Sequence, residues 1–362
     1  MAGAAAATNM DPVTVSVSAL KAAVAALFAG AGLDESAARA MADALVEADQ
    51  QGVGSHGVAM APMYIERLTL GSISPARSAA IAHDKGAVTV LDGGHMLGHL
   101  AAAQAMDMAI EKARRFGVGV AAVRHGFHFG VAGRYAAQAA DAGCIGMAMC
   151  NTRPMMGPPG GLEPIVGNNP LAIAVPTESG PPILLDMAMS EVALARVRAA
   201  ARRGEAIPAT WAVGPDGAPT TNPHKALEGM LAPMGGAKGF ALALLIDILC
   251  GLLSSGAAGG DVKPLYSDLQ TPNDCAFLFI AFDIAHFRDF PEFLAAADGV
   301  RHRVSTAPMR SGASGFAPGD ERATLAQSQT ERVALDRAVF EQLIGFAHAR
   351  AIDTSALTLP SN

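Results

Sequence analysis

Apolar residues recur with helical spacing toward both ends of the chain. Residues 18–30 and 34–51 repeat apolar positions every three or four residues, and Asp34 suits the N-cap of the second helix. The same spacing predicts helices over 58–70, 98–116 and 335–351. The helix over 58–70 follows a glycine-rich turn, so the pattern stops and restarts there.

The middle of the chain alternates between strand and helix signals. Short apolar runs bounded by glycine and proline predict strands at 88–92, 119–123, 145–150, 171–176, 183–185 and 276–282. Helices are predicted at 132–142 and 191–203, and 307–319 is predicted to be a loop. Segment 240–253 is the most apolar helix, and we expect it to be buried, since it carries Asp247 and is too short to span a bilayer.

This pattern predicts an α/β (α+β) protein with two domains. Helices from both termini, 1–75 with 290–362, are expected to form one domain, and 76–289 is expected to form a second domain around the sheet. The 362 residues are 51% hydrophobic and 16% charged, a composition that supports a large core.

Charge and cysteine content limit the classes of partner. The net charge of −7 and the lack of a dominant basic stripe argue against nucleic-acid binding. The four cysteines form no C-x-x-C pair and are expected to be buried thiols of a cytoplasmic protein. Residues 1–10 resemble a frayed tail more than a signal peptide, and we expect no membrane association.

The stretch 52–57, Gly-Val-Gly-Ser55-His56-Gly57, is the first candidate for chemistry. A histidine in an exposed glycine-rich turn can exchange a proton near neutral pH. The alternative is purely structural: Ser55 caps the following helix and His56 fills the turn.

A second histidine, His128, follows a predicted strand and precedes a helix. This position suits presentation to a ligand, although the side chain could instead pack between Phe127 and Phe129. The surrounding glycines do not have the G-x-G-x-x-G spacing, so a standard Rossmann unit is rejected.

Asp186 and Lys238 stand where strand or turn meets helix. Asp186 ends an apolar strand, where a carboxylate could orient a histidine or cap a later helix. Lys238 lies in a Gly-Gly-Ala-Lys-Gly turn that could bind an anion or simply allow close packing. Basic residues cluster at 196–203, typical of a solvated helix face, with a ribose-phosphate site as the alternative.

Two histidine pairs have spacings that a metal site would use. His95 and His99 are four residues apart, and His125 and His128 are three apart. Neither pair is followed by a third ligand at a clear spacing, so a metal site is rejected.

Six motifs together resemble the malate/L-lactate dehydrogenase family of the second type, which is unrelated to the Rossmann-fold lactate and malate dehydrogenases. They are GVGSHGV, HFGVAGRYA, GNNPLAIAVP, LLDMAMS, IPATWAVGPDGAPTTNP and PMGGAKGFALAL. The resemblance covers about 38–319. The family includes relatives that act on ureidoglycolate, sulfolactate, diketogulonate and cyclic ketimines.

The resemblance implies an NAD(P)-dependent oxidoreductase with a largely antiparallel or mixed, non-Rossmann sheet in an NAD(P)- and substrate-binding domain. It also implies a homodimer or higher homo-oligomer. His56 would be the proton donor or acceptor, with Ser55 and Asp186 as its relay, and His128 takes that role in some members. The cofactor contacts would fall on Thr152, Asp186, Met187, Ala188 and Lys238.

The chain departs from the family pattern near the expected substrate site. Met60 stands where many members carry an arginine, and Arg153 stands where a small residue is common. Arg153 could therefore replace the missing cation at the substrate carboxylate. The usual G-K-[IV] is Ala195-Arg196-Val197 here, Met189 replaces a threonine, and Gly126 replaces a serine.

These residues predict reversible hydride transfer between a nicotinamide and C2 of a small 2-hydroxy or 2-oxo acid. Either NAD or NADP would serve, with NAD favoured. A neutral histidine would accept the proton during oxidation, so oxidation should slow as the pH falls. Two alternatives remain open: a ketimine reductase that forms cyclic or N-alkyl amino acids, and a catalytically inactive cofactor-binding relative.

Overall fold

A computed structural model describes residues 11–311 and 315–357, so the predicted tail at 1–10 lies outside the described residues. The chain divides into two compact units. One contains the residues up to Thr69 and from Arg322 onward, and the other runs from Leu70 to Glu321.

The first unit is helical, with one short two-stranded sheet that joins the two ends of the chain. Asp34 caps α2 by accepting hydrogen bonds from the backbone N–H groups of Ser36 and Ala37, as the sequence predicted. Strand β1 pairs antiparallel with β11. The elements are β1 (Val13–Ser16), α1 (Val17–Gly30), α2 (Glu35–Gln50), η1 (Gly54–His56), η2 (Val58–Met60), α3 (Ala61–Leu70), β11 (Arg332–Leu335) and α11 (Arg337–His348).

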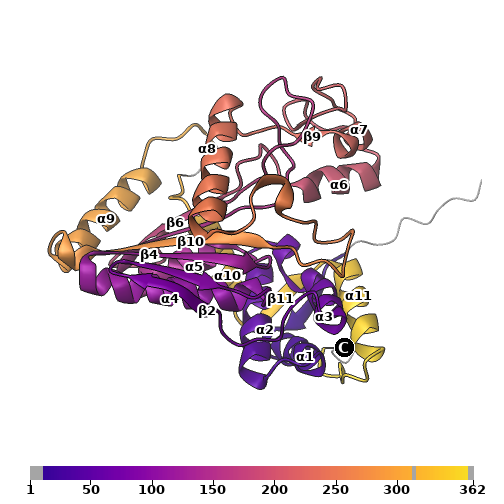
Figure 1. The fold of residues 1–362 in the computed structure, drawn as a ribbon, viewed down its shortest axis with the longest axis horizontal. Coiled ribbons are helices and arrows are strands. Elements are labelled where there is room, and N and C mark those ends of the chain that lie inside the picture. Colours follow the sequence, from indigo (N-terminus) through magenta and orange to yellow (C-terminus); the bar gives the residue numbers. More distant parts are fainter. Residues whose placement is uncertain (1–10, 312–314, 358–362) are drawn as a thin grey trace, which may run out of the picture. The chain divides into compact units, whose positions relative to one another are not determined.

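The second unit is built on a seven-stranded sheet in the order β2-β3-β4-β10-β5-β6-β7 (Figure 1). Only β3 and β4 pair in parallel, so the predicted mixed, largely antiparallel sheet is confirmed. Its strands are β2 (Ala80–Lys85), β3 (Val88–Asp92), β4 (Val118–Gly126), β5 (Cys144–Cys150), β6 (Leu171–Val175), β7 (Ile183–Met187) and β10 (Cys275–Asp283).

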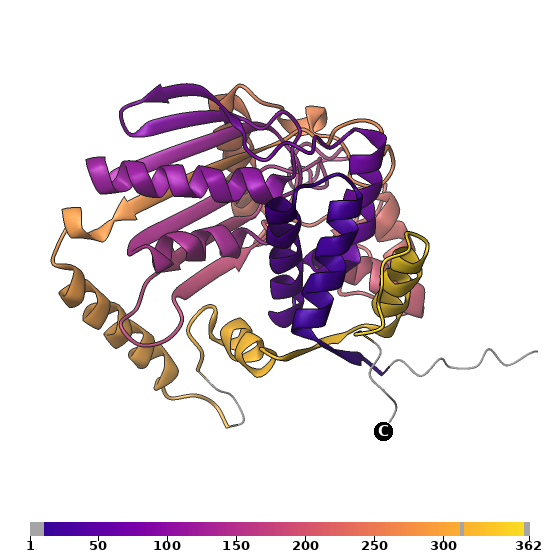
Figure 2. The same ribbon diagram turned by 90° about the horizontal axis from the view of Figure 1, so that it is seen from below.

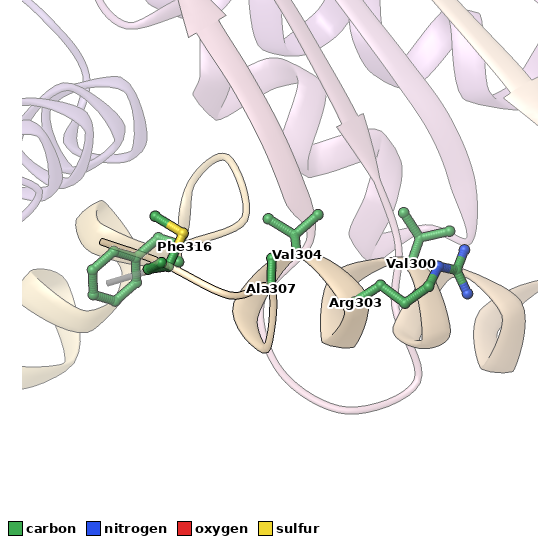
Figure 3. Close-up of a pocket in the computed structure, with 7 residues that line it drawn as sticks. Val300, Arg303, Val304, Ala307 and Phe316 are labelled. Atoms are coloured by element: carbon green, nitrogen blue, oxygen red, sulfur yellow. The ribbon is translucent and has the colours of Figure 1, made fainter. Parts of the chain in front are cut away.

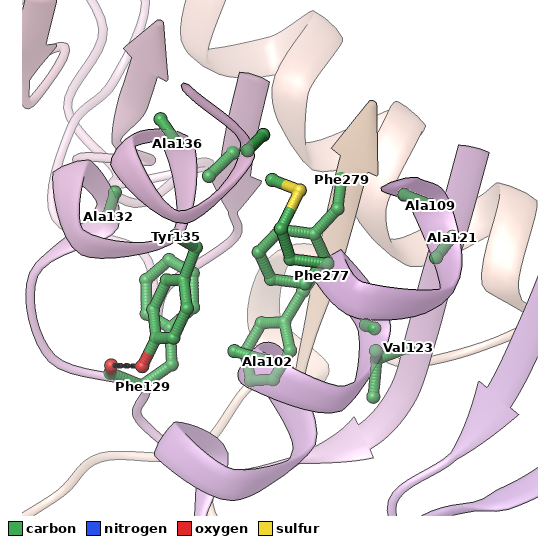
Figure 4. Packing of buried hydrophobic residues seen from close by; sticks show 14 of the residues in the cluster. Ala102, Ala109, Ala121, Val123, Phe129, Ala132, Tyr135, Ala136, Phe277 and Phe279 are labelled. Carbon is green, nitrogen blue, oxygen red and sulfur yellow. Dashed lines mark hydrogen bonds between the residues drawn. The ribbon is translucent and has the colours of Figure 1, made fainter. Parts of the chain in front are cut away.

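Helices α4 (Gly98–Phe116) and α5 (Ala132–Asp141) cover one face of this sheet (Figure 2). Alternate strand residues point into this layer because successive side chains in a strand face opposite sides. The core there is rich in alanine and contains a stack of Phe129 on Phe277, with ring centroids 4.8 Å apart. Tyr135 donates a hydrogen bond to the Phe129 carbonyl at 2.5 Å (Figure 4).

The opposite face of the sheet carries a second core, formed with the segment between β7 and β10. This segment contains α6 (Leu194–Arg203), β8 (Ala212–Val213), α7 (Pro223–Glu228), β9 (Met230–Leu231) and α8 (Ala237–Asp247). All four cysteines are buried in the second unit, as the sequence predicted.

Helix α8 is not the buried helix that its composition predicted. Ala243, Ile246 and Cys250 pack into the core, and the chain continues as a π-helical turn over Ile248–Leu252. The other side of α8 and of this turn is exposed, because one narrow stripe is enough to cover the sheet there. The exposed residues are Leu242, Leu244, Leu245, Ile248, Leu249, Leu252 and Leu253.

The units also divide the chain at a different place from the predicted boundary at 290. Helix α9 (Phe290–Ser305) belongs to the sheet unit, and α10 (Asp320–Ser328) crosses the division. Asp298 accepts hydrogen bonds from Ser179, and Arg301 donates to the Pro181 carbonyl at 3.0 Å. These contacts fasten α9 to the loop between β6 and β7. Among the described residues, none of the helices is long and apolar enough to cross a bilayer.

Candidate active site

The chemistry-bearing residues of the second unit gather at one edge of the large sheet. Antiparallel pairing brings the ends of β4, β5 and β7 to the edge where β10 and β6 begin. His128 follows β4, Thr152 follows β5, and Asp186 and Met187 end β7, with Ala188 next. The topology therefore brings together residues that lie up to 60 positions apart in the sequence.

Two buried asparagines fix the chain where it leaves β5 and enters β6. Asn169 is fully buried and accepts a hydrogen bond from the Thr152 N–H at 2.8 Å, while its amide donates to the Ala243 carbonyl of α8 at 2.8 Å. The Thr152 hydroxyl donates to Asn168 Oδ1 at 2.9 Å. Asn151, also fully buried, accepts from the Ala276 N–H at 2.7 Å. Buried amides with satisfied hydrogen bonds hold a loop in one conformation.

The Asp186 side chain lies against the first turn of α5. A Cβ added at Gly133 would lie 3.0 Å from Asp186 Oδ2 and 3.2 Å from its Cβ, so any larger residue there would push the Asp186 side chain away by a few tenths of an ångström. The positive end of a helix dipole favours a carboxylate at this place. Asp186 does not cap the helix that follows it, since the N-cap of α6 is Ala193 and makes no side-chain cap. Its contact with the first turn of α5 accounts better for a carboxylate at this position.

The turn that contains Lys238 is joined to the end of β7. The Met234 N–H donates to the Met189 carbonyl at 2.8 Å, and Ser190 forms a bridge with Pro233. Helix α8 then starts after Gly236, which has a φ of 67° and provides no side-chain cap. Lys238 itself is exposed. The helix start therefore offers backbone N–H groups and one cation on the same turn.

Arg153 follows Thr152 and is half-buried. Burial, together with the positive charge of the nearby Arg198 on α6, lowers the pKa of the Arg153 guanidinium. Arg198 also lies over the ring of Tyr266, with its Cζ 5.9 Å from the ring centroid. The half-buried Arg153 guanidinium and the exposed Arg198 are two like charges near each other, which favours an anion between or beside them.

The Ser-His turn belongs to the first unit. Ser55 Oγ and His56 Nδ1 lie 3.0 Å apart, within hydrogen-bond distance, on the single 3-10 turn η1. Ser55 is exposed and His56 is half-buried. Met60 is only 5% exposed and forms part of the packed interior. The turn thus presents an imidazole that a serine hydroxyl can polarise. Met60, by contrast, packs in the interior.

The histidines pair differently from their spacing in the sequence. The rings of His95 and His125 lie 5.5 Å apart, and those of His99 and His128 lie 6.5 Å apart. His125 Nδ1 is 2.9 Å from Asp92 Oδ1. Within the described ranges, no group of three or more histidine, cysteine or acidic residues could hold a metal ion.

A pocket of about 500 Å³ lies on α9 and the loop that follows it (Figure 3). Its wall contains one ionisable side chain, and none of the predicted site residues contributes to it. The lining residues are Val300, Arg303, Val304, Ala307, Met309, Gly315 and Phe316. This apolar hollow lacks the groups that acid–base chemistry needs.

Two features of the site were not singled out from the sequence. In the sequence, the asparagines of the G-N-N-P motif stand out only as part of that motif, and Asp49 belongs to no motif. Asp49 lies on the buried stripe of α2, in register with Ala38, Ala42 and Leu45. A charged residue at an apolar helical position was the signal that could have found it.

The model of the malate/L-lactate dehydrogenase family matches residues 15–344 of the chain. A malate/(S)-sulfolactate dehydrogenase of Methanothermus fervidus is 36% identical over 315 residues, 86% of this chain and 91% of the relative. A (2R)-3-sulfolactate dehydrogenase (NADP(+)) of Chromohalobacter salexigens is 33% identical and covers 91% of this chain and 96% of its own length. A ureidoglycolate dehydrogenase (NAD(+)) of Escherichia coli is 34% identical, with 80% of each chain covered.

Solved structures agree with these relatives. The sulfolactate dehydrogenase from Methanocaldococcus jannaschii superposes with a TM-score of 0.89 at 33% identity and covers 95% of this chain and 99% of its own. A delta1-piperideine-2-carboxylate reductase from Pseudomonas syringae has a TM-score of 0.82 at 27% identity, with 92% and 99% covered.

Proposed function

The chain belongs to the malate/L-lactate dehydrogenase family, and we propose that it moves a hydride between NAD(P) and C2 of a small 2-hydroxy or 2-oxo acid. Its relatives are named dehydrogenases of such acids, and the chain is an oxidoreductase of this kind. The observation that carries the mechanism is the contact between Ser55 Oγ and His56 Nδ1 at 3.0 Å. It commits one ring nitrogen to the serine and directs proton exchange to Nε2.

His56 acts as the acid and base of the proposed reaction. During reduction the imidazolium gives its proton to the oxygen at C2, and during oxidation the neutral ring takes it back. Ser55 polarises the ring, and the negative charge of Asp186 favours the protonated form of the imidazole. His128 is the alternative acid and base, since it follows β4 at the same sheet edge as Asp186 and Thr152. Oxidation slows as the pH falls because the base becomes protonated.

The sheet edge and the start of α8 suit a dinucleotide. Bound NAD(P) supplies or accepts the hydride. Lys238 and the uncapped backbone N–H groups of α8 would hold its phosphates, and Thr152, Met187 and Ala188 would contact the rest of the cofactor. NAD is the preferred form, and NADP is the alternative if the exposed arginines of α6 hold a ribose phosphate. The sheet unit is then the cofactor- and substrate-binding domain.

Arg153 is the proposed partner of the substrate carboxylate. It is half-buried, its pKa is lowered first by burial and then by Arg198, and an anion would relieve both effects. Met60 stands where many family members carry an arginine and is only 5% exposed, so it brings no cation to the substrate carboxylate. The substrate is therefore an acid whose carboxylate meets arginine on the sheet side.

The exposed apolar side of α8 supports a homodimer or higher homo-oligomer. Leucines and isoleucines recur along α8 and its π-helical turn, and Leu252 is 61% exposed. A second copy that covers this side would remove it from water. The four buried thiols agree with the reducing cytoplasm as the location.

A second candidate function is the reduction of a cyclic or N-alkyl ketimine. The likeness to a piperideine-2-carboxylate reductase favours it. The chemistry differs in one step, because an imine nitrogen must be protonated before the hydride arrives, whereas a ketone oxygen is protonated as charge develops.

One assay separates these functions. Purified protein is given a panel of 2-oxo acids, including pyruvate with and without methylamine, under NADH and NADPH. Turnover of the oxo acids alone supports the main proposal, and turnover only with the amine supports the ketimine reductase. Enhanced nicotinamide fluorescence without turnover of any compound would contradict both and favour an inactive relative. Arg153→Gln should raise KM for the acid at least tenfold, while Arg203→Gln, at an exposed site paired with Glu205, should not.

A further inference from the structure

Asp49 is a buried carboxylate directly beneath the Ser-His turn. It lies in the last turn of α2 and is 7% exposed. Its Oδ2 accepts a hydrogen bond from the Val58 N–H at 2.8 Å. The bond closes a loop of ten residues, 49–58, that contains both Ser55 and His56.

This hydrogen bond replaces a cap that the turn cannot make for itself. Val58 begins η2, and the residue before it, Gly57, has no side chain to accept from the first N–H groups. Within the turn, the His56 N–H donates to the Val53 carbonyl at 2.8 Å and the Gly57 N–H donates to the Gly54 carbonyl at 3.2 Å. Asp49 thus joins the end of α2 to the start of the helix after the turn.

The glycine of the Ser-His-Gly sequence is needed for this contact. A Cβ at Gly57 would lie 2.0 Å from Asp49 Oδ1 and 2.4 Å from Oδ2, closer than any real carbon can approach. The backbone of residue 57 therefore rests directly on the carboxylate. A shift of Asp49 moves the peptide that follows His56.

Burial of a charged carboxylate at position 49 destabilises the fold. Burial raises the pKa of Asp49 to about 7, partly offset by the Val58 N–H. An alanine or leucine would fit the apolar stripe without this penalty. The titratable groups on the elements packed against this end of α2 are His56 on η1, Arg332 on β11, and Lys21 on α1, which pairs with Asp43. Burial remains the first cause of the shift.

We propose that Asp49 is a positioning residue for His56: its carboxylate holds Gly57 and Val58 so that the imidazole keeps one orientation on the turn. This inference rests on the proposed acid–base role of His56 for its effect on turnover, but not for its effect on the geometry of the turn. Asp49 does not touch substrate or cofactor, so it should affect kcat and leave cofactor affinity unchanged.

The test compares three variants of the full-length protein. Asp49→Ala removes the acceptor, and Asp49→Asn keeps an oxygen for the Val58 N–H. Asp43→Ala changes a half-exposed aspartate on the same helix that pairs with Lys21. Each is measured for kcat, for the Kd of NADH by nicotinamide fluorescence, and for the His56 signal in protein labelled with 13C at histidine Cε1. His56→Gln assigns that signal.

Asp49→Ala should lower kcat at least tenfold, leave the Kd for NADH within twofold, and shift the His56 signal. Asp49→Asn should recover most of kcat, and Asp43→Ala should match the wild type. A folded Asp49→Ala protein with wild-type kcat and an unmoved His56 signal overturns the proposal.

If Asp49→Ala does not fold, Gly57→Ala tests the same contact. The new methyl group displaces the carboxylate, so it should lower kcat and move the His56 signal; wild-type values would overturn the proposal. Failure of the acid–base assignment is seen separately, as an active His56→Gln protein. In that case the His56 signal in the Asp49 variants still decides whether Asp49 positions the turn.

Discussion

The Ser-His turn and the sheet edge around Thr152 are held by different kinds of group. A single ionisable carboxylate, Asp49, fastens the turn through one backbone N–H. Neutral amides fasten the sheet edge, where Asn169 joins Thr152 to α8 with both ends of its side chain. The contact made by Asp49 should therefore respond to pH, and the contacts made by Asn169 should not. The group that exchanges protons is proposed to lie on the pH-sensitive side.

Of the changes that test this comparison, replacement of His56 should have the largest effect, a loss of kcat. We expect His56→Gln to lower kcat by about 100- to 10,000-fold, because general acid–base catalysis contributes that much. The Kd for the cofactor should not change. His128→Gln is the matched variant and should lower kcat far less. If His128→Gln loses the activity and His56→Gln keeps it, the acid–base role moves to the sheet edge.

Removal of the Asn169 side chain should destabilise the sheet edge in a way that pH does not alter. Asn169→Ala leaves the Thr152 N–H and the Ala243 carbonyl buried without this partner, at a cost of about 2–4 kcal/mol in the free energy of unfolding. Asn222→Ala, which removes only the cap of α7, should cost about 1 kcal/mol. Urea unfolding at pH 5 and pH 8 measures both. If the free energy of unfolding lost in Asn169→Ala depended strongly on pH, the neutral amide would not be what holds this sheet edge.

Asp49→Asn should show the opposite behaviour at the turn. The Asp49 carboxyl has a pKa of 3.8 in the unfolded chain and about 7 in the fold, so its stabilising contribution is present at low pH and is lost as the pH rises through 7. The asparagine does not titrate. Relative to the wild type, the variant should therefore gain roughly 2.5 kcal/mol in free energy of unfolding between pH 5 and pH 8. Urea unfolding at both pH values measures this difference. If the difference in free energy of unfolding between Asp49→Asn and the wild type is the same at pH 5 and pH 8, burial does not raise the pKa of Asp49.

The local placement of several candidate site residues could be predicted from the sequence, because each stands in a short-range signal. Ser55 and His56 lie in a glycine-rich turn, and Asp186 ends an apolar strand. Their placement on a turn and at a strand end follows from short-range chemistry. The mixed sheet was expected only from the resemblance of the motifs to a family, since strand order depends on contacts between distant segments.

Other features depend on contacts between distant segments, which local sequence patterns do not predict. The segment 240–253 was expected to be buried because nearly all of its residues are apolar, yet only one stripe of it meets the sheet. His95 and His99 suggested a pair by spacing, but each ring meets a histidine from the β4 region. The close contact between Gly133 and Asp186 could not be predicted from the sequence, because it joins α5 to β7, two elements that are distant along the chain.

We propose that His56 and Asp186 act at one nicotinamide. The most direct test is a crystal structure of the protein with reduced cofactor and oxamate, an unreactive analogue of a 2-oxo acid. We predict His56 Nε2 within about 3 Å of the carbonyl oxygen of the analogue, with Asp186 beside the nicotinamide ring. A complex in which that oxygen faces His128, or in which His56 lies away from the nicotinamide, would contradict the claim.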